Sequence, residues 1–127
     1  MIVLDTHAWI WWVTGDRRLS ARAKASLSSS KRIGVPAICV WEVGMLVTRE
    51  RLQLRVTLET WVELALHVPG VELLALTPAI SIRASQLGAP PADPADRLIA
   101  ATALVCGAPL VTRDERLQGL EGLATVW

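Results

Sequence analysis

Four acidic residues, Asp5, Glu42, Asp96 and Asp114, stand at places in the sequence where their carboxylates can act together. If they converge, each like-charged pair ~4 Å apart costs about 4 kcal/mol at an effective dielectric constant of ~20. A marginally stable fold needs a counter-ion to tolerate several such terms. An all-oxygen cluster without histidine or cysteine selects hard cations, so Mg²⁺ or Mn²⁺ is the expected occupant.

Such a cluster predicts a particular chemistry. A magnesium ion held by few carboxylates keeps several waters, and one of them can be polarised into a nucleophile. The cation also offsets charge that grows on a phosphoryl oxygen, while a carboxylate off the metal orients or deprotonates the water. The sequence suggests no serine, cysteine or histidine triad and has no glycine-rich phosphate loop. We therefore expect cleavage of a phosphodiester bond by water.

The elements that must position these acids follow a simple rhythm of short apolar runs and longer helical stretches. The candidate strands are Ile2–Leu4, Ile33–Val35, Val71–Leu76, Pro109–Thr112 and Leu123–Trp127. The candidate helices are His7–Val13, Ser20–Ser30, Ala37–Glu50, Thr57–His67, Pro78–Leu87 and Asp93–Cys106. Alternation of this kind is typical of βαβ units. It predicts an α/β fold whose parallel sheet is covered on both faces.

Topology places two of the acids at one edge of that sheet. Asp5 directly follows the first strand, and Asp114 comes shortly after the fourth. In open parallel sheets, ligands collect outside the carboxyl ends of the strands. Glu42 lies on the helix entered from the second strand, in an apolar setting, and Asp96 lies in the first turn of its helix.

Each acid also has a purely structural interpretation. Asp5 and Asp114 can be N-caps of the segments that follow them, and Asp93 is a strong N-cap candidate because a proline comes next. Asp96 can simply favour the positive end of a helix dipole. Glu42 can pair with a basic residue. For any single acid, the structural interpretation is at least as good as a catalytic one. Together, the structural interpretations do not explain why four negative charges would be gathered at one place.

Composition bounds the remaining possibilities. A chain of 127 residues with 52% apolar and 20% charged residues suits one globular domain spanning residues 1–127. The net charge is +1, but setting aside the four acids leaves 8 acidic against 13 basic residues, a balance of +5 that suits a polyanionic ligand. We expect no signal peptide, no membrane span and a cytoplasmic location. The two cysteines suggest neither a disulfide framework nor a metal knuckle.

Four segments of the sequence resemble the PIN domain, in the right order and spacing over the whole chain. They are Ile2-Val3-Leu4-Asp5-Thr6-His7, Val40-Trp41-Glu42-Val43, Asp93-Pro94-Ala95-Asp96-Arg97-Leu98-Ile99-Ala100-Ala101 and Leu110-Val111-Thr112-Arg113-Asp114. The third and fourth are the most specific. Their form is similar to the VapC-type ribonuclease toxins of bacterial toxin–antitoxin pairs.

The resemblance implies a three-layer α/β/α sandwich with a mainly parallel sheet. It also implies Mg²⁺- or Mn²⁺-dependent cleavage of RNA by a homodimer that a partner antitoxin inhibits. By motif position, the catalytic set is Asp5, Glu42, Asp96 and Asp114, with all but Glu42 as metal ligands. Supporting residues are Thr6, Thr112 and Asp93, the last mainly as an N-cap. The aromatic residue usual in the third segment is Ala95 here, and an upstream histidine is missing, which puts nearby substrate contacts in doubt.

Four arginines are candidates for RNA contact. Arg17 and Arg18 open a run of six basic residues between positions 17 and 32 that contains no acid, for which a solvated helix face is the alternative. Arg97 and Arg113 each adjoin one of the four acids, where they can contact RNA or balance charge.

Other functions remain to be weighed. A haloacid-dehalogenase phosphatase needs an acid where His7 stands, and a receiver domain needs a late lysine, whereas no lysine follows Lys31. The stronger alternatives lie within the family: a non-catalytic RNA- or protein-binding PIN domain, or a PIN nuclease that processes RNA or cuts DNA. The intact set of four acids argues against the non-catalytic alternative, because a binding module has no reason to keep their repulsion.

Overall fold

A computed structural model describes all 127 residues of the chain, which form five strands and seven helices. In chain order they are β1 (Ile2–Leu4), α1 (Thr6–Thr14), α2 (Ala21–Ser29), β2 (Ile33–Pro36), α3 (Ala37–Thr48), α4 (Leu58–Leu66), β3 (Val71–Leu74), α5 (Pro78–Gln86), α6 (Pro94–Cys106), β4 (Leu110–Val111), α7 (Glu115–Gln118) and β5 (Thr125–Val126). All five predicted strands and all six predicted helices are present. The short helix α7 was not predicted.

The strands form one parallel sheet in the order β3-β2-β1-β4-β5, which confirms the predicted α/β class. Strand β1 is central: Val3 is paired with Gly34 of β2 on one side and with Leu110 of β4 on the other. Its three residues are buried, as expected for a short apolar strand covered on both faces. Ile2–Leu4 therefore forms the buried centre of the sheet.

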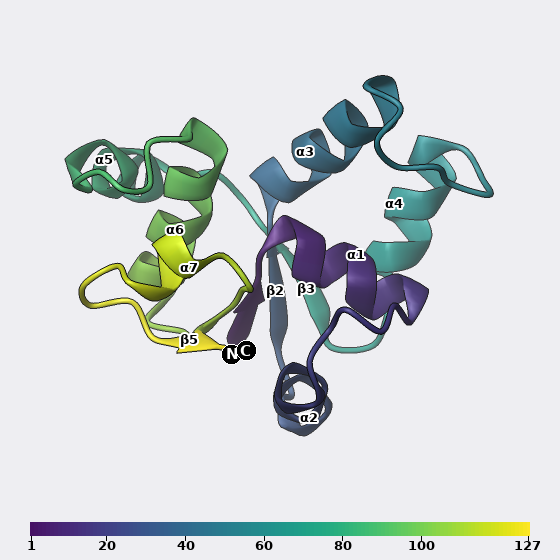
Figure 1. The fold of residues 1–127 in the computed structure, drawn as a ribbon, viewed down its shortest axis with the longest axis horizontal. Helices are drawn as coiled ribbons and strands as arrows, with labels where there is room; N and C mark the ends of the chain where they lie inside the picture. The colour runs from purple at the N-terminus through teal and green to yellow at the C-terminus, as the bar shows by residue number, and fades with distance from the viewer.

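Helices cover both faces of the sheet, so the predicted three-layer sandwich is confirmed. In Figure 1, α5 and α6 lie on one side of the strands, and α1 and α4 lie on the other. Helix α6 buries Ile99, Ala100 and Ala103. On the opposite side, Trp9 of α1 meets Trp61 of α4 edge to face, with ring centroids 5.0 Å apart. Aromatic pairs in this geometry stabilise a core beyond the area that they bury.

Polar side chains cap six of the seven helices, and α3 is the exception. Ser20 accepts a hydrogen bond from the N–H of Ala23, and Thr57 accepts one from Thr60. Asp93 caps α6 ahead of Pro94. Asp5 and Asp114 also cap the helices that follow them. None of the seven helices has the length and hydropathy that a membrane crossing requires.

The C-terminal end of α6 supplies a test of the fold. Gly107 ends this helix in the left-handed conformation, with φ of 61°, whereas Gly119 after α7 has φ of −85°. A side chain costs about 1 kcal/mol at a left-handed position and little at a right-handed one. We expect Gly107→Ala to lower the free energy of unfolding in urea by about 1 kcal/mol, with Gly119→Ala nearly neutral. Equal effects of the two substitutions would contradict this account.

Candidate active site

The four acids predicted from the sequence line one open cleft of about 720 Å³. The cleft lies where the central strands β1 and β4 end and the following helices begin, as the topology predicts. Its lining is strongly polar and consists of Asp5, Thr6, His7, Trp11, Arg18, Glu42, Arg51, Asp93, Asp96, Arg113, Asp114 and Arg116. The chain therefore brings carboxylates from distant segments to one place, while the role of each remains a prediction.

Asp5 is the most enclosed acid, with 9% of its surface exposed. One carboxylate oxygen, Oδ1, accepts a hydrogen bond of 2.9 Å from the N–H of His7 and so caps α1. The other, Oδ2, accepts one of 2.5 Å from the hydroxyl of Thr112. Burial raises the pKa of Asp5, and the Thr112 hydrogen bond opposes that rise. A buried carboxylate held at both oxygens has a fixed orientation.

Thr112 connects the side chain of Asp5 to the backbone of Asp114. Its hydroxyl donates to Asp5 and also accepts a hydrogen bond of 3.0 Å from the backbone N–H of Asp114. The residue is fully buried at the end of β4. Both hydrogen-bonding capacities of the hydroxyl are thus used inside the site. This contact pattern suits the supporting role predicted for Thr112.

Thr6 supports Glu42 in a similar way. Its hydroxyl donates to Oε1 of Glu42 over 2.5 Å, which links α1 to α3 across 36 residues of sequence. Burial raises the pKa of Glu42, as does the charge on Asp5, whereas the Thr6 hydrogen bond lowers it. The sequence places Glu42 in an apolar setting, where a carboxylate without a partner is unstable. The hydroxyl of Thr6 is the hydrogen-bond donor that stabilises it there.

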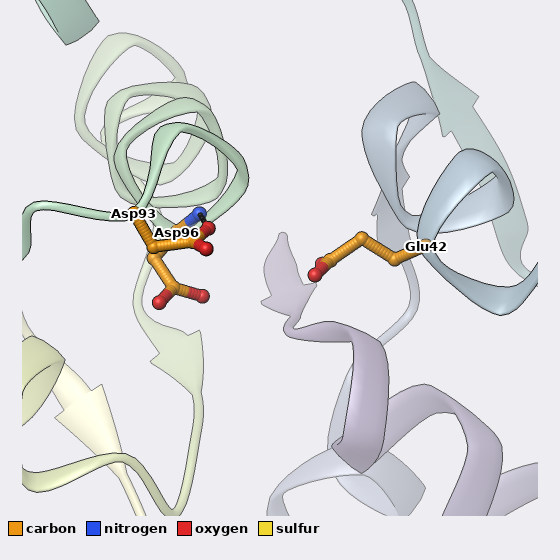
Figure 2. A group of neighbouring side chains, drawn as sticks. All are labelled: Glu42, Asp93 and Asp96. Carbon is orange, nitrogen blue, oxygen red and sulfur yellow. Dashed lines mark hydrogen bonds between the residues drawn. The ribbon is translucent and has the colours of Figure 1, made fainter. Parts of the chain in front are cut away.

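The tightest group of acids includes Asp93. One oxygen from each of Glu42, Asp93 and Asp96 can be chosen so that all three lie within 4.8 Å of one another. Figure 2 shows Glu42 reaching from α3 toward the two aspartates at the start of α6, and Asp93 accepts the N–H of Asp96 over 3.1 Å. Asp93 is thus an N-cap, as predicted, and also a full member of the acidic group.

Asp96 is the acid whose charge is most disfavoured. Its pKa is raised to about 7, first by burial and then by the charges on Asp93, Glu42 and Asp114. A carboxylate perturbed by several neighbouring carboxylates in a cleft is typical of a functional site. The helix-dipole interpretation does not explain this shift, because a helix N-terminus lowers an acid's pKa.

The sequence analysis missed Arg116, the main cation in contact with the acids. Its guanidinium donates to Oδ1 of Asp114 over 3.1 Å and to Oδ2 over 2.6 Å, and lies 3.4 Å from Oδ2 of Asp96. These contacts hold the pKa of Asp114 below its ordinary value. The sequence shows Arg116 two residues after the capping Asp114. Only the formation of the short helix α7 brings its guanidinium to the Asp114 carboxylate.

The predicted RNA-contacting arginines fall into different places. Arg113 and Arg18 line the cleft, although Arg18 also pairs with Asp16 over 2.8 Å. Arg17 is exposed and is not part of the cleft lining. Arg51, which the sequence analysis did not single out, does line it.

Arg97 has a position different from the one expected. Its guanidinium donates to the backbone carbonyls of Ala84, Leu87, Gly88 and Pro91, and it does not line the cleft. A side chain with its donors committed to four carbonyls fixes the loop between α5 and α6. Through that loop Arg97 positions the start of α6, where Asp93 and Asp96 stand.

The donor set fits a hard divalent cation. The cleft offers carboxylate and hydroxyl oxygens, with no cysteine among its lining residues. A hollow of about 430 Å³ adjoins it between α3 and α6 and shares Glu42, Arg51 and Asp93. Trp41, which is 56% exposed, lines this hollow. The site therefore combines a place for a cation with a neighbouring surface that suits an extended ligand.

Comparison with known proteins shows the family and the fold of the chain. Residues 2–123 match the PIN domain family. The chain is 39% identical over 119 residues to Ribonuclease VapC22 of Mycobacterium tuberculosis, covering 92% of this chain and 89% of that protein. Among solved structures, DNA-bound VapBC from Salmonella typhimurium superposes with a TM-score of 0.73 at 19% identity, covering 98% of this chain and 97% of the other. VapBC2 from Rickettsia felis, bound to a promoter DNA fragment, gives 0.70 at 15% identity with the same coverage. The four acids thus sit in one cleft of a chain that belongs to the PIN domain family.

Proposed function

We propose that this protein is a metal-dependent endoribonuclease that hydrolyses phosphodiester bonds in RNA with Mg²⁺ or Mn²⁺. The observation that carries the proposal is the convergence of five carboxylates on one cleft, where Asp96 has a pKa of about 7. Such mutual repulsion favours the binding of a divalent cation. The named activity of the relative from Mycobacterium tuberculosis supports RNA as the substrate.

In this proposal Asp5, Asp96 and Asp114 hold the cation and Glu42 acts on the attacking water. The bound cation would supply a polarised water and offset charge on the phosphoryl oxygen. Thr6 occupies Oε1 of Glu42 and leaves Oε2 available to orient the water or take its proton. Because burial raises the pKa of Glu42, it is a stronger base than an exposed glutamate. Asp93 is close enough to serve as an auxiliary acid.

The biological role that we propose is that of the toxin in a toxin–antitoxin pair. The relative carries a VapC name, and solved structures of this fold include a toxin–antitoxin complex from Klebsiella pneumoniae. The protein would act on RNA in the cytoplasm, as a homodimer of single PIN-like domains spanning residues 1–127, under control of a partner antitoxin. Two alternatives are a binding module without activity, and a PIN nuclease that cuts DNA or processes RNA. Cleavage assays with RNA and DNA separate the binding module and the DNA nuclease from the proposed activity.

The central prediction concerns the loss of one ligand. Purified protein should cleave structured RNA in Mg²⁺ or Mn²⁺ and lose activity in EDTA, because the cation generates the nucleophile. Asp96→Asn should lower the rate about 100-fold or more, since even residues that only hydrogen-bond to the ligands of a metal contribute 10- to 100-fold. Glu121→Gln, an exposed acid outside the cleft, is the matched control.

The same assay tests the alternatives. Cleavage that persists in EDTA would falsify metal dependence. RNA binding with no cleavage under any metal would favour the binding module, and cleavage of DNA in preference to RNA would favour a DNA nuclease.

A second prediction concerns the hydroxyl that connects Asp5 to the backbone of Asp114. Thr112→Val should lower kcat/KM about 10- to 100-fold, because Asp5 and the N–H of Asp114 both lose their partner. Thr112→Ser should restore most of the activity. Thr102→Val removes another buried hydroxyl, which donates to the carbonyl of Leu98 and does not line the cleft. If Thr102→Val impaired cleavage as much as Thr112→Val, positioning by Thr112 would be refuted.

A third prediction concerns stability without metal. The pKa of Asp96 is about 7 in the fold and near 3.8 when unfolded, so folding disfavours its charged form. The resulting destabilisation is complete above pH 7 and vanishes as the pH falls below about 4. Asp96→Asn should therefore raise the free energy of unfolding at pH 8 by about 1 kcal/mol, a figure reduced for the partial exposure of the carboxyl.

Thermal unfolding in EDTA measures this effect. The melting temperature of Asp96→Asn should exceed that of the native protein by a few degrees at pH 8, and the difference should disappear by about pH 4. A lower melting temperature for Asp96→Asn at pH 8 would contradict the raised pKa.

A further inference from the structure

Arg116 lines the acidic cleft and donates hydrogen bonds to two of its acids. Every side-chain contact that its guanidinium makes is with the acids, three with Asp114 and Asp96. Its side chain is 56% exposed, and it stands on the four-residue helix α7. Hydrogen bonds to the two acids therefore fix the position of this exposed guanidinium.

The two acids that bind Arg116, Asp96 and Asp114, are both proposed ligands of the metal. Oδ2 of Asp114 lies 2.6 Å from the guanidinium, and Oδ2 of Asp96 lies 3.4 Å from it. A cation bound to these carboxylates competes with the guanidinium for their oxygens and repels its positive charge. Metal and Arg116 are therefore competitors for the same two acids.

We propose that Arg116 is the internal counter-ion of the metal-free site, and that an incoming divalent cation displaces it from Asp96 and Asp114. The inference rests on the proposed metal site. A guanidinium offsets one charge and a divalent ion offsets two, so the exchange proceeds once the ion is abundant enough. Until then Arg116 stabilises the fold against the repulsion of the acids, and it lowers the affinity for metal because it must be removed.

The other cations in the structure provide matched comparisons. Arg113 lines the same cleft and carries the same charge, but it makes no hydrogen bond to an acid there. Its removal changes the electric field of the cleft without freeing any carboxylate oxygen. Arg97 is fixed by four backbone carbonyls, so its environment should not respond to metal.

The test measures metal binding without RNA. Calorimetric titration with Mn²⁺ compares the native protein with Arg116→Gln and Arg113→Gln. Displacement predicts about tenfold tighter binding for Arg116→Gln, because charge-assisted hydrogen bonds no longer compete, and about twofold tighter binding for Arg113→Gln. Equal gains for the two variants would show a general field effect and overturn the proposal.

Two further measurements address the exchange itself. Without metal, Arg116→Gln should melt at a lower temperature than Arg113→Gln, and saturating Mn²⁺ should close that gap. In the native protein, the Nε–H resonance of Arg116 in an NMR spectrum should shift with Mg²⁺ in step with site occupancy, while that of Arg97 stays constant. A resonance of Arg116 that ignores Mg²⁺ would sink the inference.

The outcomes also separate this inference from the proposed function. If the native protein binds neither Mg²⁺ nor Mn²⁺, both fail. If it binds metal and cleaves RNA, but Arg116→Gln and Arg113→Gln bind metal with equal affinity, only the displacement fails.

Discussion

Repulsion among carboxylates confined to one cleft is the constraint on which the rest of the site depends. Holding five acids around a space of about 720 Å³ costs free energy, and burial together with the neighbouring carboxylates raises the pKa of Asp96 to about 7. The fold meets this cost locally. Thr112 and Thr6 each donate a hydroxyl to one carboxylate, and Arg116 bridges two others. Each of these contacts offsets repulsion and also fixes the direction in which an oxygen points.

The structural and chemical interpretations of the acids turn out to be compatible. Asp5, Asp93 and Asp114 each use one oxygen to cap a helix, as their positions in the sequence suggest. A cap occupies part of a carboxylate's accepting capacity, and the remainder serves the cleft. Capping also ties each acid to the backbone, after strands β1 and β4 for Asp5 and Asp114 and after the α5–α6 loop for Asp93. The placement that makes an aspartate a good N-cap is therefore the same placement that directs it to the functional edge of a parallel sheet.

Local signals in the sequence predicted the fold and the positions of Asp5 and Asp114, whereas the choice of Asp96 rested mainly on the resemblance to the PIN domain. Short apolar runs identified the strands, and a strand-end position identified Asp5 and Asp114. Contacts that depend on side-chain direction were out of reach. The sequence does not indicate that Arg97 donates to four backbone carbonyls around the preceding loop. Nor does it indicate that the Arg116 guanidinium points into the cleft. The helix α7, only four residues long, is too short for periodicity to reveal, and Arg116 went unnoticed with it.

Arg97 and Arg116 have different roles because their guanidinium groups donate to different kinds of acceptor. Arg97 spends its donors on neutral carbonyls, so it holds the loop before α6 at any metal concentration. Arg116 spends its donors on charged oxygens, so its position depends on what else those oxygens can bind. A carbonyl has no stronger partner available, whereas a carboxylate prefers a divalent ion. The type of acceptor therefore explains why Arg97 holds the start of α6 in place and why a metal ion can displace Arg116. A site that is stable without metal and still binds metal needs both kinds of contact.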